Sequence, residues 1–220
     1  MSAVQLFDSL GVVAISWETV VVTAARDESD PADDAMSRYA DGDDAAFAVV
    51  HRAISERLRA FLTRMGRSPA LADDLLQETF LRIHRARGSF EPGGRVLPWC
   101  YAIARNVYID HVRQRAVRKE RPMSSETEEQ ELDAPAGPET DGEQVSIAAD
   151  LARAVEQTLA KLPPNQREAF VLLRYEGMSV ADAAAILGAT EGAVKLRAFH
   201  AYEALRAALG DVAPKKRGAA

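Results

Sequence analysis

The sequence contains a single cysteine, Cys100, among 220 residues, so neither a disulfide framework nor a paired-cysteine zinc or redox site can form within the chain. Its four histidines lack the spacing of metal ligands, and no nucleophile and base pair or phosphate-binding glycine loop is present. The most apolar stretch, residues 10–25, is interrupted by Glu18 and is too short to cross a bilayer. These absences predict a cytoplasmic protein with no metal, no cofactor, no catalytic residues and no membrane insertion, which is not an enzyme.

The charges are distributed unevenly along the chain, although the formal net charge is only −6. Residues 44–118 hold 13 basic and 7 acidic side chains, and residues 150–220 hold 10 and 8. Residues 1–43 and 119–149 each hold 2 basic and 9 acidic side chains. Two positive blocks separated by an acidic stretch indicate two modules that face a polyanion and are joined by a tether.

Both positive blocks show apolar residues at steps of three and four, and no run alternates with the two-residue period of a strand, so we expect an all-α fold. In the first block, one helix follows Phe47 and ends at a C-cap, Gly66. A second helix begins after Ser68 as N-cap, with Pro69 at its first position, and runs to about residue 87. A loop over residues 88–97 separates it from a third helix, over residues 99–118.

The second block predicts helices over residues 147–162, 166–176 (ended by Gly177) and 179–187, and a further helix after Thr190. The last two are joined by a tight turn at Gly188, which is the layout of a helix-turn-helix, although an ordinary helical hairpin has the same spacing. The final helix presents four apolar residues to the core: Val194, Ala198, Ala201 and Leu205.

The remaining segments lack a core pattern. Residues 119–147 are acidic, contain proline and glycine, and predict a flexible linker. Residues 1–36 predict an N-terminal extension that is either disordered or the product of an overcalled start site, with translation beginning at Met36. Residues 210–220 form a basic tail.

Four co-linear motifs carry a family resemblance. They begin at Ala72 (ADDLLQETF), Pro98 (PWCYAIARN, followed by Asp110 and Arg113), Leu162 (LPPNQREA) and Glu191 (EGAVK). In order and spacing they resemble the extracytoplasmic-function (ECF) group of bacterial RNA polymerase sigma factors, of the sigma-70 family. The resemblance covers residues 37–118 and 148–209, the second and fourth regions of the family.

The resemblance implies a factor that binds core RNA polymerase, directs it to promoters with −35 and −10 elements, and helps to melt the latter. The implied partners are the clamp helices of the largest polymerase subunit, the flap region, promoter DNA and a possible anti-sigma factor. In the family the first motif binds the polymerase, and its acidic, hydrogen-bonding character suits a basic partner helix, although a solvated acidic face has the same composition. The expected polymerase-binding residues are Asp73, Asp74, Leu75, Gln77, Glu78 and Phe80.

The loop and the third helix match the part of the family that captures unpaired bases of the −10 element. Aromatic rings and arginine planes suit base stacking, although Trp99 and Phe90 also fit a core role. The expected −10 residues are Arg87, Phe90, Arg95, Trp99, Arg105, Asn106, Asp110 and Arg113, with Tyr101 as a further aromatic candidate.

The last helix matches the one that enters the major groove at the −35 element, with Thr190, Glu191, Lys195, Arg197 and His200 as the expected contacts. The sequence departs from the common family pattern at Ala193, Leu196 and His200. Cys100 replaces a frequent leucine and predicts a small buried hydrophobe in preference to a redox sensor. Two other functions remain open: a helix-turn-helix regulator that acts without polymerase, and a sigma-like decoy for an anti-sigma factor.

Overall fold

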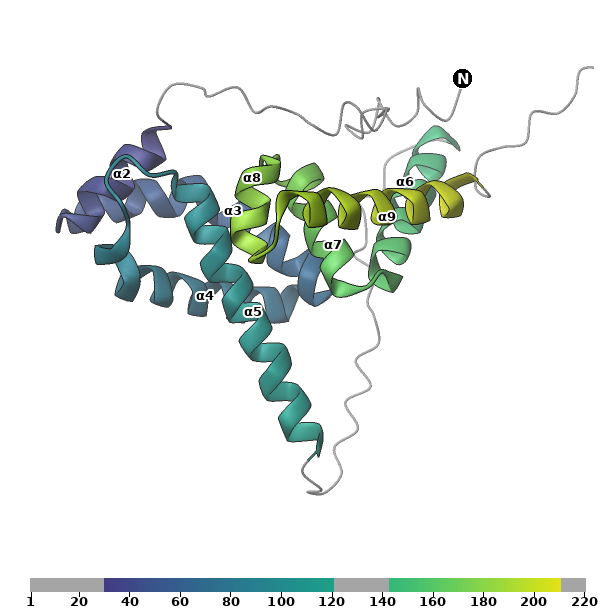
Figure 1. The fold of residues 1–220 in the computed structure, drawn as a ribbon, viewed down its shortest axis with the longest axis horizontal. Helices are drawn as coiled ribbons and strands as arrows, with labels where there is room; N and C mark the ends of the chain where they lie inside the picture. Colours follow the sequence, from purple (N-terminus) through teal and green to yellow (C-terminus); the bar gives the residue numbers. More distant parts are fainter. Residues whose placement is uncertain (1–29, 121–142, 211–220) are drawn as a thin grey trace, which may run out of the picture. The chain divides into compact units, whose positions relative to one another are not determined.

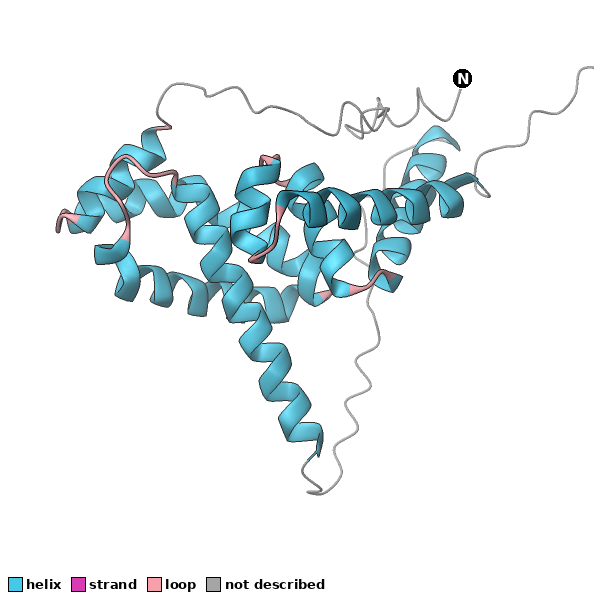
Figure 2. Cartoon of the chain, viewed as in Figure 1, coloured by secondary structure: helices cyan, strands magenta, loops and turns pink. Residues whose placement is uncertain are grey.

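A computed structural model describes residues 30–120 and 143–210, and within these ranges the regular elements are all helices (Figures 1 and 2). The all-α prediction is therefore confirmed. The described helices divide into two compact units, one built around α2 to α5 and the other around α6, α7 and α9. The predicted basic tail beyond residue 210, most of the predicted linker and residues 1–29 lie outside the described residues.

The first unit begins with a helix that was not predicted from the sequence. α2 (Pro31–Ala40) starts at Asp30, whose side chain accepts a hydrogen bond from the Ala32 amide at 2.9 Å. Proline at its first position suits a helix start. The helix packs on α3 and buries four residues at i, i+3, i+4 and i+7: Ala32, Ala35, Met36 and Tyr39.

The expected boundary at residue 37 lies inside α2. A chain that started at Met36 would lack the first half of this helix, including its N-cap.

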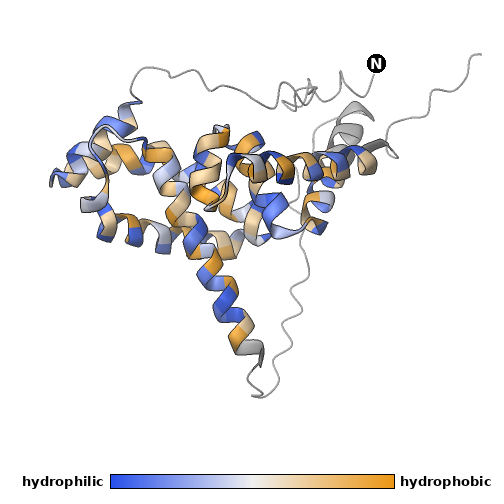
Figure 3. Cartoon of the chain, in the orientation of Figure 1, coloured by the Kyte–Doolittle hydropathy of each residue, from blue (hydrophilic) through white to orange (hydrophobic). Residues whose placement is uncertain are grey.

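The three predicted helices of this unit are present as α3 (Phe47–Gly66), α4 (Pro69–Ala86) and α5 (Val96–Glu120). They pack against one another, and a short 3-10 turn, η2 (Asp44–Ala46), precedes α3. Ser68 caps α4 as predicted, since its hydroxyl accepts the Leu71 amide at 3.3 Å. Apolar residues on the facing sides of α3, α4 and α5 form the core, whereas the outer part of α5 is largely hydrophilic (Figure 3).

The end of α3 differs from the prediction by one residue. Gly66 is the last helical residue, and the left-handed position is occupied by Arg67, with φ of 60°. A Cβ atom at Gly66 would lie 3.1 Å from the Leu71 side chain, so glycine here allows the close approach of the following helix. Arg67 is exposed and is the only non-glycine residue with positive φ among the described residues.

We therefore expect Arg67→Gly to stabilise the first unit by about 1 kcal/mol, because glycine adopts the left-handed conformation without the Cβ penalty. The matched control is Ala53→Gly, at an exposed position inside α3, which should destabilise the unit by about 1 kcal/mol. Thermal unfolding of the full chain measures both. A lower melting temperature for Arg67→Gly would contradict the expectation.

The loop between α4 and α5 is shorter than predicted. A 3-10 turn, η3 (Arg87–Ser89), continues from α4, and α5 already begins at Val96 instead of residue 99. Pro98 is accommodated because it lies in the first turn of α5, where amides have no intrahelical partner. Between these helices, the Gly94 amide donates to the Glu91 carbonyl at 2.8 Å across Pro92 and Gly93, and Gly93 has φ of 75°, the pattern of a type II turn.

The second unit contains α6 (Glu143–Lys161), α7 (Pro164–Phe170), the π-helical turn η4 (Val171–Tyr175) and α9 (Glu191–Gly210). The predicted linker, residues 119–147, overlaps both flanking helices, because α6 begins at Glu143 and α5 ends at Glu120. The core of the unit includes a cluster of Leu159, Leu162, Phe170, Ala201 and Leu205.

The arginine of the third motif, Arg167, is a buried side chain with several hydrogen bonds. Its side chain is only 8% exposed, and it donates hydrogen bonds to the carbonyls of Leu159 (2.9 Å), Ala160 (3.2 Å) and Leu162 (3.1 Å). These carbonyls lie at the C-terminal end of α6, where a helix leaves them unpaired. Arg167 therefore has a structural role in joining α6 to α7.

A tight turn joins α8 (Val180–Leu187) to α9. Gly188 has φ of 59°, its amide lies 3.3 Å from the Ala185 carbonyl, and the Ala189 amide donates to the Ala184 carbonyl at 3.0 Å. This pair of bonds is a Schellman motif, which ends α8 so that α9 can start at once in a new direction. The predicted glycine turn between the last two helices is confirmed.

Candidate functional surfaces

The exposed face of α4 carries most of the expected polymerase-binding residues. Asp73, Asp74 and Gln77 are exposed, whereas Glu78 and Phe80 are half-buried. Leu75, also expected as a contact, is only 5% exposed and packs in the core of the unit. The burial follows from helix geometry, because Leu75 shares a face with Ala72 and Thr79, which are fully buried.

The carboxylates on this face differ in how they are paired. Asp73 accepts a hydrogen bond from Arg59 Nε of α3 at 2.7 Å. Asp74 forms no ion pair or hydrogen bond with any of the described residues. Asp74 is therefore the carboxylate of α4 that is available to a basic partner without first breaking an internal contact.

A groove of about 670 Å³ lies beside the acidic residues, between α4 and the start of α3. The ring centroids of His51 and Phe80 are 4.5 Å apart on its wall, and Leu81 lies in it with 45% of its surface exposed. Leu81 was not among the expected contacts. The signal was in the sequence, since Leu81 stands four residues after Gln77 and seven after Asp74, on the same helix face. The other lining residues are Tyr39, Asp44, Phe47, Asp73, Leu76, Gln77 and His84.

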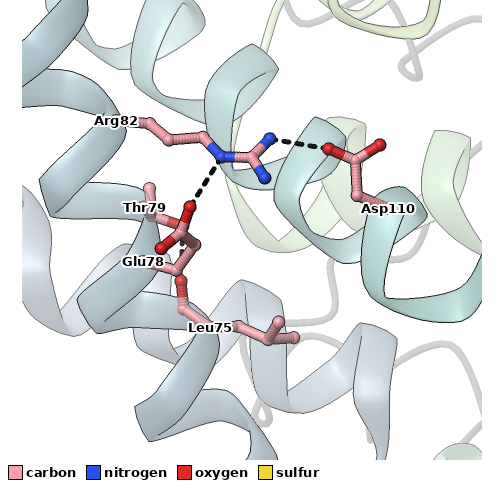
Figure 4. A network of polar contacts seen from close by, with 5 residues as sticks. All are labelled: Leu75, Glu78, Thr79, Arg82 and Asp110. Carbon is pink, nitrogen blue, oxygen red and sulfur yellow. Dashed lines mark hydrogen bonds and ion pairs between the residues drawn. The ribbon is translucent and has the colours of Figure 1, made fainter. Parts of the chain in front are cut away.

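Arg82 links α4 to α5 (Figure 4). Its Nε donates to Glu78 Oε1 at 2.9 Å, and its Nη1 donates to Asp110 Oδ2 at 2.7 Å. The hydrogen bond to Asp110, followed by that to Glu78, raises the pKa of Arg82, so this side chain is a permanent cation. Glu78 and Asp110, expected to meet different partners, thus share one internal counter-ion that sequence reasoning missed.

Arg87, an expected −10 residue at the start of the loop, contacts several neighbouring side chains. Its guanidinium lies 5.1 Å from the centroid of the Tyr39 ring and 3.7 Å from Asp44, and it donates to His84 Nδ1 at 2.8 Å. Tyr39 Oη and His84 Nδ1 are 2.5 Å apart. Arg87 is therefore fixed by α2, η2 and α4 before any DNA is present.

The aromatic candidates fall into two classes. Phe90 is 5% exposed and packs edge to face against Trp99, with centroids 5.4 Å apart, whereas Trp99 is partly exposed. Tyr101 is fully buried and packs edge to face against Phe61 at 5.2 Å. Stacking on a base needs an accessible ring, so Phe90 and Tyr101 are core residues and Trp99 is the accessible aromatic of the three.

The polar candidates follow one side of α5. Asn106 and Arg113 are exposed, Asp110 lies between them in sequence and is half-buried, and Arg105 is half-buried. Arg95, before the helix, is exposed. The predicted polar stripe at steps of four and three is thus present on α5.

Cys100, near the start of α5, is completely buried. Burial, with a smaller contribution from Asp33, raises the pKa of its thiol far above the usual range, so the thiol stays protonated. The prediction of a small buried hydrophobe is confirmed.

α9 places its expected contacts around an exposed face. Val194, Ala198, Ala201 and Leu205 are buried on the opposite side, as predicted. Of the expected contacts on α9, Glu191, Lys195 and His200 are exposed, and Arg197 is half-buried at the flank. Lys195 Nζ lies 3.8 Å from Glu191 Oε2, a loose pair that a DNA contact can replace.

Two large apolar side chains on α9 were missed as candidates. Leu196 is 57% exposed and Phe199 is 48% exposed. A step of three residues places them on one face, and a step of 100° per residue puts that face opposite the buried stripe. Helix register counted from Val194 and Ala198 is the signal that could have found them.

Comparisons with known proteins match segments of both units. The family model for sigma-70 region 2 matches residues 50–118, and that for sigma-70 region 4 matches residues 152–205. The RNA polymerase sigma factor CarQ of Myxococcus xanthus is 38% identical over 177 residues, which cover 80% of this chain and 97% of that protein. The ECF sigma factor SigF of Caulobacter vibrioides is 35% identical over 171 residues, covering 77% and 89%.

Solved structures show the same relationship. The sigma factor RpoE of Bartonella quintana, in complex with the anti-sigma factor NepR, is 27% identical with a TM-score of 0.58, covering 74% of this chain and 96% of that one. CnrH, in complex with the cytosolic domain of CnrY, is 26% identical with a TM-score of 0.60, covering 83% and 99%. The chain belongs to the sigma-70 family of RNA polymerase sigma factors. Within that family it is a member of the ECF group, whose members are initiation factors and not enzymes.

None of the described helices is both long and apolar enough to cross a membrane. In the described residues no three histidine, cysteine or acidic side chains are grouped so that they could hold a metal ion.

Proposed function

We propose that this chain binds core RNA polymerase through the exposed face of α4 and directs it to promoters through α9 and the α4–α5 loop. The observation that carries the proposal is the presence, in one chain, of matches to both sigma-70 region 2 and sigma-70 region 4. A DNA-binding regulator that acts alone needs only the second of these. The chain acts in the cytoplasm, where polymerase and promoter are found, and catalyses no reaction of its own.

The polymerase-binding step uses charge and apolar area together. Asp74 offers an unpaired carboxylate, Gln77 offers an amide, and Leu81 with Phe80 offers apolar surface at the groove. A basic, amphipathic partner helix fits this combination, because opposite charge orients the partner while burial of apolar surface stabilises the complex.

The promoter step divides between the two units. On the second unit, α9 enters the major groove of the −35 element, with Thr190, Glu191 and Lys195 at its N-terminal end where base edges and phosphates are met. On the first unit, Trp99 stacks on an unpaired base of the −10 element. Arg87, Arg95, Arg105, Asn106 and Arg113 contact its backbone or base edges.

The test is run-off transcription with purified core polymerase, with and without this protein, on DNA fragments that include the region upstream of its own gene. We expect new transcripts that depend on the protein. DNA binding without transcripts would favour a regulator that acts alone, and binding to an anti-sigma factor without polymerase binding would favour a decoy.

An anti-sigma factor is a further partner in this proposal, since one similar structure was solved with such a protein. In this proposal the anti-sigma factor and core polymerase compete for the same face of α4. Competition between core polymerase and a candidate anti-sigma factor for the purified chain tests this point, and simultaneous binding would contradict it.

The exposed side chain of Leu196 predicts that binding to the −35 element depends on a thymine methyl group. An apolar side chain in the major groove contacts the methyl group of thymine, and burying one methyl group contributes about 0.8 kcal/mol. Replacing the contacted thymine with deoxyuridine, which lacks only that methyl group, should therefore weaken binding about fourfold. In Leu196→Ala the same replacement should have no effect.

Lys195→Ala is the matched control for this prediction, because it should weaken DNA binding while leaving the sensitivity to deoxyuridine intact. Fluorescence anisotropy with duplexes substituted one thymine at a time measures all three proteins. If no deoxyuridine substitution in the −35 element weakened binding of the wild-type chain, the assignment of Leu196 would be contradicted.

A further inference from the structure

The far end of the α4–α5 loop is held by α2, the helix whose first half precedes the region recognised in the sequence. Asp33 Oδ1 accepts a hydrogen bond from the Val96 amide at 2.7 Å, and Ser37 Oγ lies 3.4 Å from the Gly93 amide. Val96 is the first residue of α5 and is fully buried. Its amide is one of those that an α-helix cannot pair internally, so Asp33 supplies an N-terminal cap to α5 from another helix.

The near end of the same loop is held by the same helix. Tyr39, at the end of α2, lies under the guanidinium of Arg87, where the loop begins. Ala32, Ala35 and Met36 anchor α2 in the core at 2% exposure or less. α2 thus contacts both ends of the segment that leads to Trp99.

We propose that Asp33 is a positioning residue for promoter opening, which fixes the loop and the start of α5 before DNA arrives. The inference rests on the proposed function, in which this loop and Trp99 capture unpaired bases. A loop that is already ordered loses less conformational entropy when it binds, so fixing it in advance favours the open complex. The carboxylate also interacts favourably with the positive end of α5.

Asp34 provides a matched control. It lies next to Asp33 in the first turn of α2, carries the same charge and is exposed, but forms no hydrogen bond or ion pair with the described residues of α5. Asp34→Ala therefore removes the same charge from the same helix turn and leaves the cap in place. Asp33→Asn removes the charge but keeps an oxygen acceptor, so it should preserve most of the effect of the native residue.

The first measurement is amide hydrogen exchange of the full-length chain, without polymerase. We expect Asp33→Ala to speed exchange of residues 93–97 about fivefold, the effect of losing a helix cap, with Asp33→Asn and Asp34→Ala within twofold of the wild type. Unchanged exchange at these amides in Asp33→Ala would overturn the inference.

The second measurement is promoter opening by holoenzyme reconstituted with each variant, read as permanganate reactivity of unpaired thymines at equal occupancy of polymerase. Asp33→Ala should form about fivefold fewer open complexes than Asp34→Ala. Equal opening by the two variants would overturn the inference while leaving the proposed function intact. A wild-type chain that bound no polymerase and opened no promoter would instead overturn the proposed function.

Discussion

Asp74→Arg is expected to weaken binding to core RNA polymerase about 100-fold. Asp74 is the only unpaired carboxylate among the described residues of α4, and the substitution places a cation where a basic partner helix would meet it. Burying like charges against each other at an interface costs several kcal/mol, which exceeds the loss from simply removing one contact. The affinity can be measured by anisotropy of labelled protein titrated with core polymerase. Transcription should fall in parallel.

The matched control is Glu56→Arg, which makes the same change of charge at an exposed position on α3. It should bind polymerase like the wild type. Glu78→Gln should have a smaller effect than Asp74→Arg, because Glu78 is already paired with Arg82. Equal affinities for Asp74→Arg and Glu56→Arg would show that α4 is not the docking face.

Trp99→Ala is expected to reduce the affinity of the holoenzyme for single-stranded DNA of the −10 element by roughly 10- to 100-fold, the loss of one base-stacking contact. The duplex should still be recognised through the −35 element, so closed complexes should form and opening should fail. Binding of a labelled single strand and permanganate footprinting measure the two steps separately.

Trp99→Phe separates stacking from packing in this second prediction. A smaller ring retains part of the stacking surface and part of the contact with Phe90, so its defect in single-strand binding should be intermediate. If Trp99→Ala lowered the melting temperature of the first unit but bound single strands normally, Trp99 would be a core residue like Phe90.

Local sequence signals predicted most helices correctly because their causes are local. Ser68 with Pro69, Gly177 and Gly188 mark helix ends by capping and by backbone conformation, and these do not depend on distant residues. The helix that was missed, α2, has the same kind of signal: an aspartate N-cap, a proline and four apolar residues at helical spacing. It was overlooked because alanine supplies two of the four and contributes little to an apolar pattern.

The exposure of some site residues could be predicted from the sequence, and that of others could not. The faces of α4 and α9 follow from helix register, so the exposure of Asp74 and Lys195 was predictable. The burial of Phe90 and Tyr101 was not, because it depends on which side of α5 meets α3 and the loop. The family motif identified residues that matter without separating those that face a partner from those that face the core.

The sequence alone determined that this protein is all-helical, because helix periodicity and caps are properties of neighbouring residues. Its resemblance to ECF sigma factors was likewise carried by the sequence, in four ordered motifs. Only the tertiary structure decided which charges are already satisfied. Arg82 pairs with Asp110 across 28 positions and Asp33 caps Val96 across 63. Hydrogen bonds require contact within about 3 Å, and contacts between residues so far apart in sequence arise only when helices pack.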